Sequence, residues 1–223
     1  MKKKITSLQS SLTEVAMQKK RVCIIGGGST GLCCCRVLLE YNNCFEPVIF
    51  ERQSFIGGQW HYQDVLSIDN NKQDLTSSVY PNMLTNIPCS LMQYSDFPFL
   101  SNRSDSYFNV HDMEKYLLQY VQQHQLQKYL LLNVKIDHVQ ELSIDTGFNV
   151  TYTITTKHNE ITTIKQQSLL TNLSCNIDKA KRIVLNETED YCQYIEHFDV
   201  VCVCNGHFSK YYIPDINGLI VVH

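Results

Sequence analysis

The sequence lacks three features that would assign it to a broad class at once: a long hydrophobic run, a strong net charge and an internal repeat. No apolar stretch approaches the ~18 residues that a membrane-spanning helix needs. The 22 acidic and 19 basic residues leave a net charge of -3, whereas nucleic-acid-binding domains are typically strongly basic. No nucleic-acid partner is therefore indicated. With 223 residues, the chain is long enough for one large or two small domains.

Metal and disulfide motifs are also missing, although the chain has ten cysteines. No C-x-x-C pair stands with a second pair, or with histidines, at the spacing of a zinc site, and we predict no metal. Cys33–Cys35 fall in a helical pattern, and Cys23, Cys202 and Cys204 fall in apolar strand patterns. We interpret them as small buried hydrophobic residues in a reducing compartment.

The N-terminal residues 1–20 are basic but lack the long apolar core of a secretory signal. We therefore expect an N-terminal extension and a protein that is cytoplasmic or associated with the endoplasmic reticulum. A targeting role for the extension is the alternative.

The strongest positive signal runs from Val22 to Glu51. A short apolar run, Val22–Ile25, is followed by a glycine cluster, a helical stretch, a second apolar run, Pro47–Phe50, and the acid Glu51. This is the strand, glycine turn, helix, strand and acid of a dinucleotide-binding unit. The glycine cluster matches G-x-G-x-x-G, and its predicted cofactor-binding residues are Gly26, Gly27, Gly28, Ser29, Thr30 and Gly31.

Each part of this unit has a physical purpose. Gly26 permits a tight turn, Gly28 lets the backbone approach a pyrophosphate, and Gly31 lets the helix pack closely on the strand. The helix N-terminus offers free N–H groups and the positive end of a dipole to phosphate. Glu51 follows at about 20 residues, as expected of an acid that binds the ribose. The alternative is a glycine turn that only packs the strand against the helix.

Two later segments are ambiguous by themselves. Ile56–Trp60 places paired glycines beside an aromatic residue, which suggests either backbone lying against a flat ligand or an ordinary turn. Tyr80–Phe99 is rich in aromatic residues and contains prolines that forbid one long helix. Ordered irregular backbone of this kind often lines a site, and a packed structural loop is the alternative.

The next elements complete an α/β pattern. Apolar residues at helical spacing predict an amphipathic helix over Val110–Leu126, with Asp112 as its N-cap. Alternation predicts a strand over Leu130–Leu142 and a β-hairpin formed by Asn149–Thr156 and Glu160–Lys165.

The last part of the chain has a weak pattern and then a strong one. Residues 166–197 are polar, and we interpret them as a variable insertion or loop. Phe198–Cys204 is typical of a buried parallel strand. It ends in Asn205 and Gly206, where backbone can approach a ligand at the carboxyl edge of the sheet. The predicted fold is a Rossmann-like α/β domain with a parallel sheet, a crossover helix and a small antiparallel β layer.

Taken in order, these motifs resemble the N-terminal part of the flavin-containing monooxygenases of the dimethylaniline type. The resemblance rests on the glycine cluster with Glu51, the sequences ERQSFIGGQW and YPNMLTNIPCSLMQYSDFPF, the helix MEKYLLQYVQQHQL and the segment VVCVCNGHFSKYYIPDINGL. It covers about Arg21 to Gly218, apart from the polar segment 166–197.

The resemblance implies FAD and NADPH as cofactors. The glycines of the cluster would hold the FAD pyrophosphate, Glu51 would bind the adenosine ribose, and Gln59 and Trp60 would lie along the flavin. Asn86, preceded by Thr85, would face the flavin ring and act in catalysis by holding a flavin C4a-hydroperoxide. Such enzymes reduce FAD with NADPH and pass one oxygen atom of O2 to a small nitrogen or sulfur nucleophile.

The resemblance does not extend to a second glycine cluster for NADPH, because the chain's nine glycines form none. We therefore expect an FAD-binding domain over residues 21–207 and the start of a hinge over residues 208–223, leading to an NADPH domain that this sequence lacks. Such a truncated chain could be inactive. The alternatives are a non-catalytic FAD-binding remnant and a relative of the flavoprotein disulfide reductases, which would need a redox cysteine pair.

Overall fold

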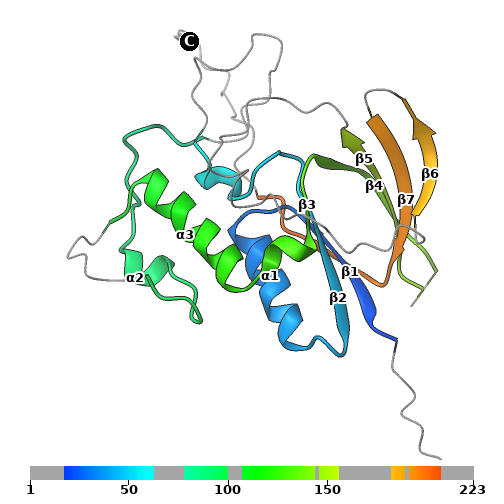
Figure 1. Ribbon diagram of the computed structural model, residues 1–223, viewed down its shortest axis with the longest axis horizontal. Coiled ribbons are helices and arrows are strands. Elements are labelled where there is room, and N and C mark those ends of the chain that lie inside the picture. Colours follow the sequence, from blue (N-terminus) through cyan, green and yellow to red (C-terminus); the bar gives the residue numbers. More distant parts are fainter. Residues whose placement is uncertain are drawn as a thin grey trace, which may run out of the picture.

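Two four-stranded sheets, one parallel and one antiparallel, organise the computed structural model of the chain (Figure 1). The structure describes residues 18–62, 78–99, 107–143, 146–155, 182–188 and 191–206. The strand order is β3-β2-β1-β8 in the parallel sheet and β4-β5-β7-β6 in the antiparallel sheet. This architecture confirms the predicted fold class.

The parallel sheet consists of β1 (Lys20–Ile25), β2 (Phe45–Phe50), β3 (Leu130–Leu131) and β8 (Val200–Val203). β1 lies at its centre and pairs in parallel with both β2 and β8. Its apolar run is buried on both faces, which is typical of a parallel strand. The predicted crossover helix is α1 (Ser29–Glu40), which connects β1 to β2.

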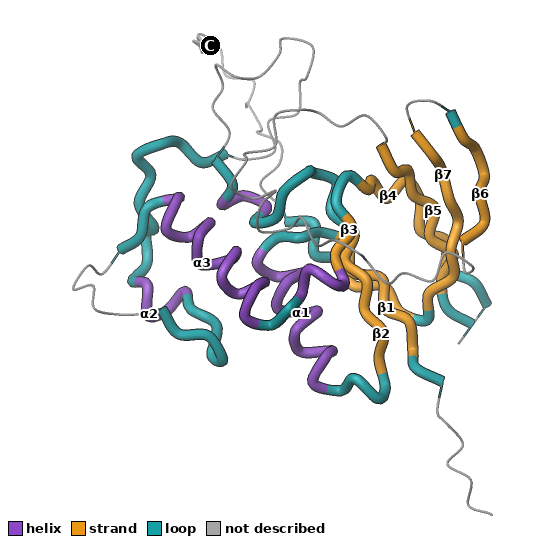
Figure 2. The backbone as a smooth tube through the Cα atoms, in the orientation of Figure 1, coloured by secondary structure: helices purple, strands orange, loops and turns teal. Residues whose placement is uncertain are grey.

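Alternate residues of β1 belong to two separate cores. Val22 and Ile24 belong to the larger core, together with residues of α1 and α3 (Val110–Gln123). Cys23 belongs to the second core, which residues of the antiparallel sheet complete. Helices therefore cover one face of the parallel sheet, and the antiparallel sheet covers the other (Figure 2).

The antiparallel sheet consists of β4 (Val134–Glu141), β5 (Phe148–Thr155), β6 (Arg182–Glu187) and β7 (Tyr191–Phe198). β5 pairs with β4 on one side and with β7 on the other. β6 pairs with β7 and forms an edge of the sheet. The predicted strand over Asn149–Thr156 is therefore confirmed as β5, whereas its predicted partner Glu160–Lys165 lies outside the described residues.

A buried ion pair joins the two sheets. Glu196 on β7 is only 2% exposed, and its carboxylate accepts hydrogen bonds from the Arg21 guanidinium and, at 2.8 Å, from the Tyr152 hydroxyl. The Arg21 guanidinium also lies 4.4 Å from the centroid of the Phe198 ring. A buried carboxylate without its cation would be strongly destabilising, so this contact fixes β7 against the start of β1.

The prediction of one strand over Leu130–Leu142 is wrong, because the segment forms two strands in two different sheets. Asn133 separates them and has a left-handed φ of 59°. Its carbonyl accepts a hydrogen bond from the Thr155 N–H at 3.1 Å. Asparagine tolerates this conformation better than most residues, and a single such residue breaks a strand without disturbing its hydrophobic alternation.

The prediction of a loop across residues 166–197 is also wrong where β6 and β7 form. Their sequence is polar because β6 is an edge strand and because Glu196, a charged residue, points into the interior. Inward charge of this kind conceals the period of two on which strand prediction depends.

The helix predicted over Val110–Leu126 is confirmed as α3, but its N-cap is Asn109 and not Asp112. The Asn109 side chain accepts a hydrogen bond from the backbone N–H of Asp112 at 2.9 Å. Both residue types are good caps, so composition does not distinguish them. The shorter helical elements are α2 (Cys89–Met92) and the 3₁₀ turns Gly58–Trp60 and Leu126–Tyr129.

The aromatic segment packs on α3. The Tyr116 hydroxyl donates to the Phe97 carbonyl and accepts from the Tyr94 N–H, both at 2.7 Å. The rings of Tyr94 and Tyr120 lie 4.3 Å apart, centroid to centroid. The segment is thus ordered irregular backbone anchored to a helix. Among the helices that the structure describes, none has the length and apolar character of a membrane span.

We predict that protonation of His124 destabilises the contact between α1, α3 and the aromatic segment. The Arg36 Nε–H donates to His124 Nδ1 at 2.8 Å, and the Asp96 carboxylate lies 3.3 Å from Arg36 Nε. This donation requires a neutral imidazole. Burial and the Arg36 charge lower the pKa of His124, against the opposing effect of Asp96. A lowered pKa in the folded state means that this stability is fully present above the unfolded value of about 6.5 and is lost as the pH falls from there through the lower folded pKa.

Urea unfolding at a series of pH values between about 7.5 and about 5 tests this, since only a histidine titrates there at its unperturbed pKa. His124→Asn keeps an acceptor near the Nδ1 position at every pH, so its stability should fall less than that of the wild type. His138→Asn, at an exposed position on β4, is the matched control. Equal pH dependence in the wild type and in His124→Asn would contradict the prediction.

Candidate functional site

The glycine turn after β1 is closed by contacts that leave no room for side chains. Gly26 has a left-handed φ of 111°, and a Cβ there would lie 2.4 Å from the Cys204 carbonyl oxygen. A Cβ on Gly31 would lie 1.9 Å from the Gly26 carbonyl oxygen. These positions therefore need glycine for the packing reasons that the fingerprint suggested: a tight turn at Gly26 and close helix packing at Gly31.

Gly28 differs, because a side chain there would meet little. It has ordinary extended backbone with a φ of -79°, and a Cβ would lie 3.8 Å from Gly58 Cα. The second glycine pair faces this position: the Gly57 N–H donates to the Gly27 carbonyl at 3.0 Å. The two glycine segments, far apart in sequence, thus form a cradle of bare backbone at the carboxyl edge of the parallel sheet.

The N-terminus of α1 keeps its N–H groups available for an anion. In the described part of the chain, no side chain caps this helix, and its first turn contains no acidic residue. α3 is the contrast, since Asn109 caps it and Asp112 stands in its first turn. Uncapped N–H groups and the positive dipole end favour a phosphate. Of these two helices, α1 is the one suited to bind it.

Glu51 lies at the end of β2 and holds the glycine turn. Its side chain accepts hydrogen bonds from the Gly27 N–H at 2.7 Å and from the Gln53 N–H at 2.8 Å. Glu51 is 8% exposed, and burial raises the pKa of its carboxyl, although both N–H groups oppose this. A carboxylate has further lone pairs, so these bonds leave capacity for a ribose hydroxyl.

Further predicted site residues are Gln59 and Trp60, in the second glycine segment, and Gly206, after β8. The Gln59 side-chain amide donates to the Ser78 hydroxyl at 2.5 Å. Trp60 is half-buried and packs against the larger core. Gly206 follows β8, has a left-handed φ of 70°, and is exposed with open space around its Cα.

The aromatic segment reaches the glycine turn through a residue that sequence reasoning missed. The Tyr94 hydroxyl donates to the Ser29 carbonyl, in the first turn of α1, at 2.6 Å. Burial raises the pKa of this hydroxyl, which keeps it a donor. Thr85 is buried, and its hydroxyl accepts from the Phe108 N–H at 3.1 Å, so it holds the segment together. Asn86 is exposed.

The surroundings of the cysteines near the turn disfavour the thiolate that a redox pair needs. Cys34 on α1 interacts with Cys202 and Cys204, and burial raises its pKa. The thiol is the form that burial favours, whereas disulfide chemistry needs a thiolate. The nine cysteines in the described residues are free. The disulfide-reductase alternative therefore gains no support.

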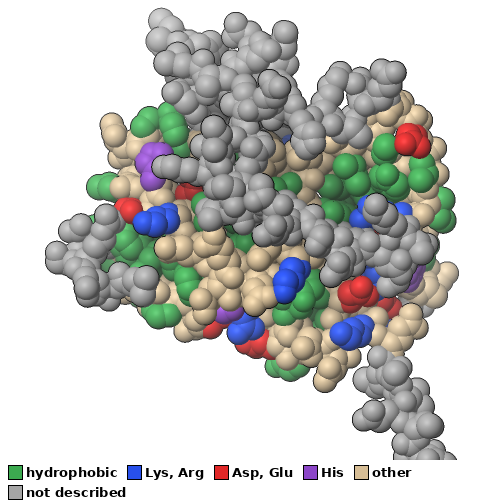
Figure 3. Space-filling model, viewed as in Figure 1, with side chains coloured by type: hydrophobic (Ala, Val, Ile, Leu, Met, Phe, Trp, Pro, Cys, Tyr) green, Lys and Arg blue, Asp and Glu red, His purple; other side chains and the backbone are tan. Residues whose placement is uncertain are grey.

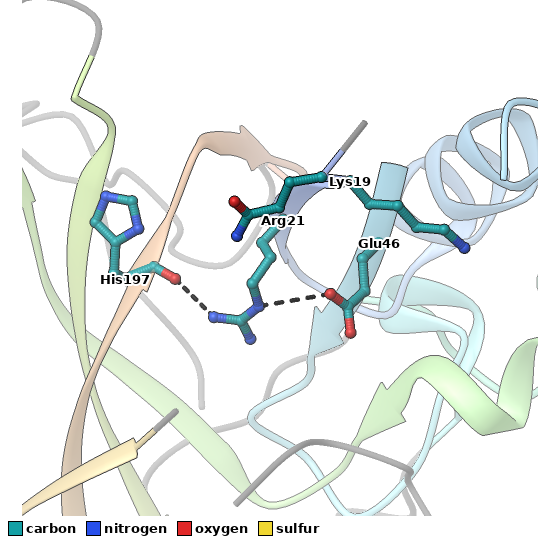
Figure 4. Close-up of a pocket in the computed structure, with 5 residues that line it drawn as sticks. Lys19, Arg21, Glu46 and His197 are labelled. Atoms are coloured by element: carbon teal, nitrogen blue, oxygen red, sulfur yellow. Dashed lines mark hydrogen bonds and ion pairs between the residues drawn. The ribbon is translucent and has the colours of Figure 1, made fainter. Parts of the chain in front are cut away.

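A surface hollow of about 590 Å3 lies at the opposite, amino edge of the sheet. Gln18, Lys19, Arg21, Glu46 and His197 line it (Figure 4). Arg21 there donates to the His197 carbonyl at 2.7 Å and lies 3.9 Å from the Glu46 carboxylate. Basic and acidic side chains are likewise interspersed on the face shown in Figure 3. Because the Arg21 guanidinium there already contacts a carbonyl and a carboxylate, the hollow is a weaker anion site than the glycine cradle.

The packing of the glycines predicts that two alanine substitutions have opposite outcomes. Gly31→Ala should lower the free energy of unfolding by about 3 kcal/mol, because the new Cβ overlaps the Gly26 carbonyl. Gly28→Ala should change it by less than about 1 kcal/mol, because the φ is ordinary and the new Cβ would make only an ordinary van der Waals contact with Gly58. Thermal and urea unfolding measure both. Equal destabilisation by the two changes would contradict this account of the turn.

Comparison with known proteins agrees with the family resemblance found in the sequence. Residues 19–170 match the family described as FMO-like, flavin-binding monooxygenase-like. The flavin-containing monooxygenase FMO GS-OX5 of Arabidopsis thaliana is 30% identical over 208 residues, covering 89% of this chain and 38% of the relative. Flavin-containing monooxygenase 5 of Rattus norvegicus is 27% identical over 206 residues, covering 89% and 30%.

The fold is likewise similar to that of solved proteins. The S-allyl-L-cysteine S-oxygenase from Allium sativum matches with a TM-score of 0.63 and 22% identity, covering 91% of this chain and 40% of that protein. The chain thus spans well under half the length of the relatives that it matches. Together with the glycine turn and its acid, the family match establishes that this chain belongs to the flavin-binding monooxygenase-like family.

Proposed function

We propose that this chain forms the FAD site of a flavin-dependent monooxygenase that uses NADPH and O2. The observation that carries the proposal is the backbone cradle of Gly28 and Gly58 beside the uncapped N-terminus of α1. Because the chain spans 30–40% of its relatives' length, the activity of a whole enzyme is part of the proposal.

The adenosine and pyrophosphate end of FAD fits the glycine turn. The N–H groups of Ser29 and Thr30, at the start of α1, would bind the pyrophosphate, and the lack of a side chain on Gly28 would let it approach. Glu51 would bind the ribose with the lone pairs that Gly27 and Gln53 do not use.

The flavin end would lie along the second glycine segment and the aromatic segment. Gln59, Trp60, Thr85, Asn86 and Gly206 are the residues that we assign to it. When bound, FAD supplies hydride acceptance and oxygen activation, and the protein supplies orientation and exclusion of water. As the family resemblance implies, the substrate class that we propose is a small nucleophile that is oxygenated at nitrogen or sulfur.

The pyrophosphate assignment predicts that Gly28→Val abolishes FAD binding without unfolding the chain. The purified protein is incubated with FAD and desalted, and the retained flavin is read from its visible absorption. The wild type should retain flavin, Gly28→Ala should retain less, and Gly28→Val should retain none, because branched carbons fill the phosphate approach. Thermal unfolding is the control for the fold. Retention of flavin by a folded Gly28→Val protein would disprove our placement of the phosphate.

NADPH then distinguishes an enzyme from a protein that only binds FAD. Anaerobic bleaching of the bound flavin by NADPH would show that the chain takes up hydride. Flavin that dithionite bleaches but NADPH does not would show that this chain binds FAD without the reductive reaction. That result would support the non-catalytic alternative for the chain itself.

The assignment of Asn86 predicts a change in the spectrum of the bound flavin. Asn86→Ala should leave FAD retention within about twofold and shift or reshape the visible bands, because an amide hydrogen bond near the flavin ring would be lost. Asn82→Ala, at another exposed asparagine of the same segment, is the matched control. If the spectra of Asn86→Ala and of the wild type coincide, Asn86 does not face the flavin.

A further inference from the structure

We propose that His61 and Glu114 form a clamp that positions the second glycine segment, Gly57–Trp60, for the dinucleotide. The proposal rests on the function proposed above, since it adds two positioning residues to the same site. Neither residue belongs to the glycine fingerprint, and neither stood out in the sequence.

The two side chains meet in a part-buried, directional contact. His61 is 7% exposed, and its ring stacks on Phe55 with centroids 3.6 Å apart. Its Nδ1 lies 2.5 Å from the Glu114 carboxylate oxygen, which is an acceptor. Charge-assisted hydrogen bonds in partly desolvated surroundings are stronger and more directional than neutral ones. The contact therefore fixes both the position and the rotation of the imidazole ring.

The clamp acts on the glycine segment through the backbone. The His61 N–H donates to the Gly58 carbonyl at 3.3 Å and closes the 3₁₀ turn. A Cβ on Gly57 would lie 3.9 Å from the side chain of Leu117, one helical turn after Glu114. A Cβ on Gly58 would in turn lie 3.2 Å from Gly28 Cα. Contacts thus run from α3 through His61 to the cradle.

The segment needs such a restraint because of its own composition. Gly57 and Gly58 both have left-handed φ values, 108° and 56°. Glycine reaches such values freely, but it also loses more conformational entropy than any other residue when it is fixed. A ligand that had to order this turn would bind more weakly, and a turn ordered in advance binds more tightly. The His61–Glu114 contact supplies that order before any ligand arrives.

Trp60 makes the proposal testable without FAD. It is the chain's one tryptophan, so its fluorescence anisotropy in the unliganded protein reports the order of this segment. Glu114→Ala and His61→Ala should each lower the anisotropy and weaken FAD binding about tenfold, the effect of losing one charged hydrogen bond. Glu114→Gln retains an acceptor but loses the charge, so it should restore both readouts in part.

A double mutant tests whether the residues act through each other. His61→Ala combined with Glu114→Ala should bind FAD no more weakly than His61→Ala alone, whereas independent contributions would add. Asn109→Ala is the structural control, because it removes the cap of α3 and leaves the clamp intact. His138→Ala controls for the loss of a histidine.

Two outcomes would overturn the clamp: additive effects of the two substitutions, or an Asn109→Ala protein with the same anisotropy and affinity as Glu114→Ala. A wild-type protein that binds no FAD would instead overturn the proposed function. The Trp60 anisotropy would still test whether His61 and Glu114 order the second glycine segment.

Discussion

The carboxyl edge of the parallel sheet depends on backbone meeting backbone with no side chain between. Gly31 lies against the Gly26 carbonyl, Gly26 lies against Cys204, and Gly58 lies against Gly28. α1, the end of β8 and the second glycine segment therefore converge on one turn. A Cβ at Gly26 or Gly31 would separate these elements, and the helix N-terminus would no longer stand where a phosphate could reach it.

Two buried carboxylates support this arrangement from different directions. Glu51 holds the glycine turn through backbone N–H groups, and Glu196 holds the antiparallel sheet through the guanidinium of Arg21. At the amino edge, the Arg21 guanidinium is already bound by the Glu196 carboxylate and the His197 carbonyl. At the carboxyl edge, the N–H groups at the start of α1 are left without a side-chain cap. An anionic ligand is therefore favoured at the carboxyl edge.

Two elements outside the glycine fingerprint contact the cradle or its neighbouring segments. Tyr94 ties the aromatic segment to Ser29, and His61 ties the second glycine segment to α3. Both contacts use a polar group on an aromatic ring, which combines burial with a fixed direction. These contacts order both segments within the protein itself, which the proposed FAD site would need in order to orient its ligand.

The sequence by itself determined the glycine turn, the acid after β2, the crossover helix and α3, because each depends on spacing among neighbours in the chain. Only the tertiary structure decided the break at Asn133, the strands β6 and β7, and the partners of Glu196, His61 and Tyr94. For Glu196, His61 and Tyr94, the physical reason is that each polar group is satisfied by a partner far away in the sequence. The hydrophobic periodicity of the sequence does not show which distant residue is that partner.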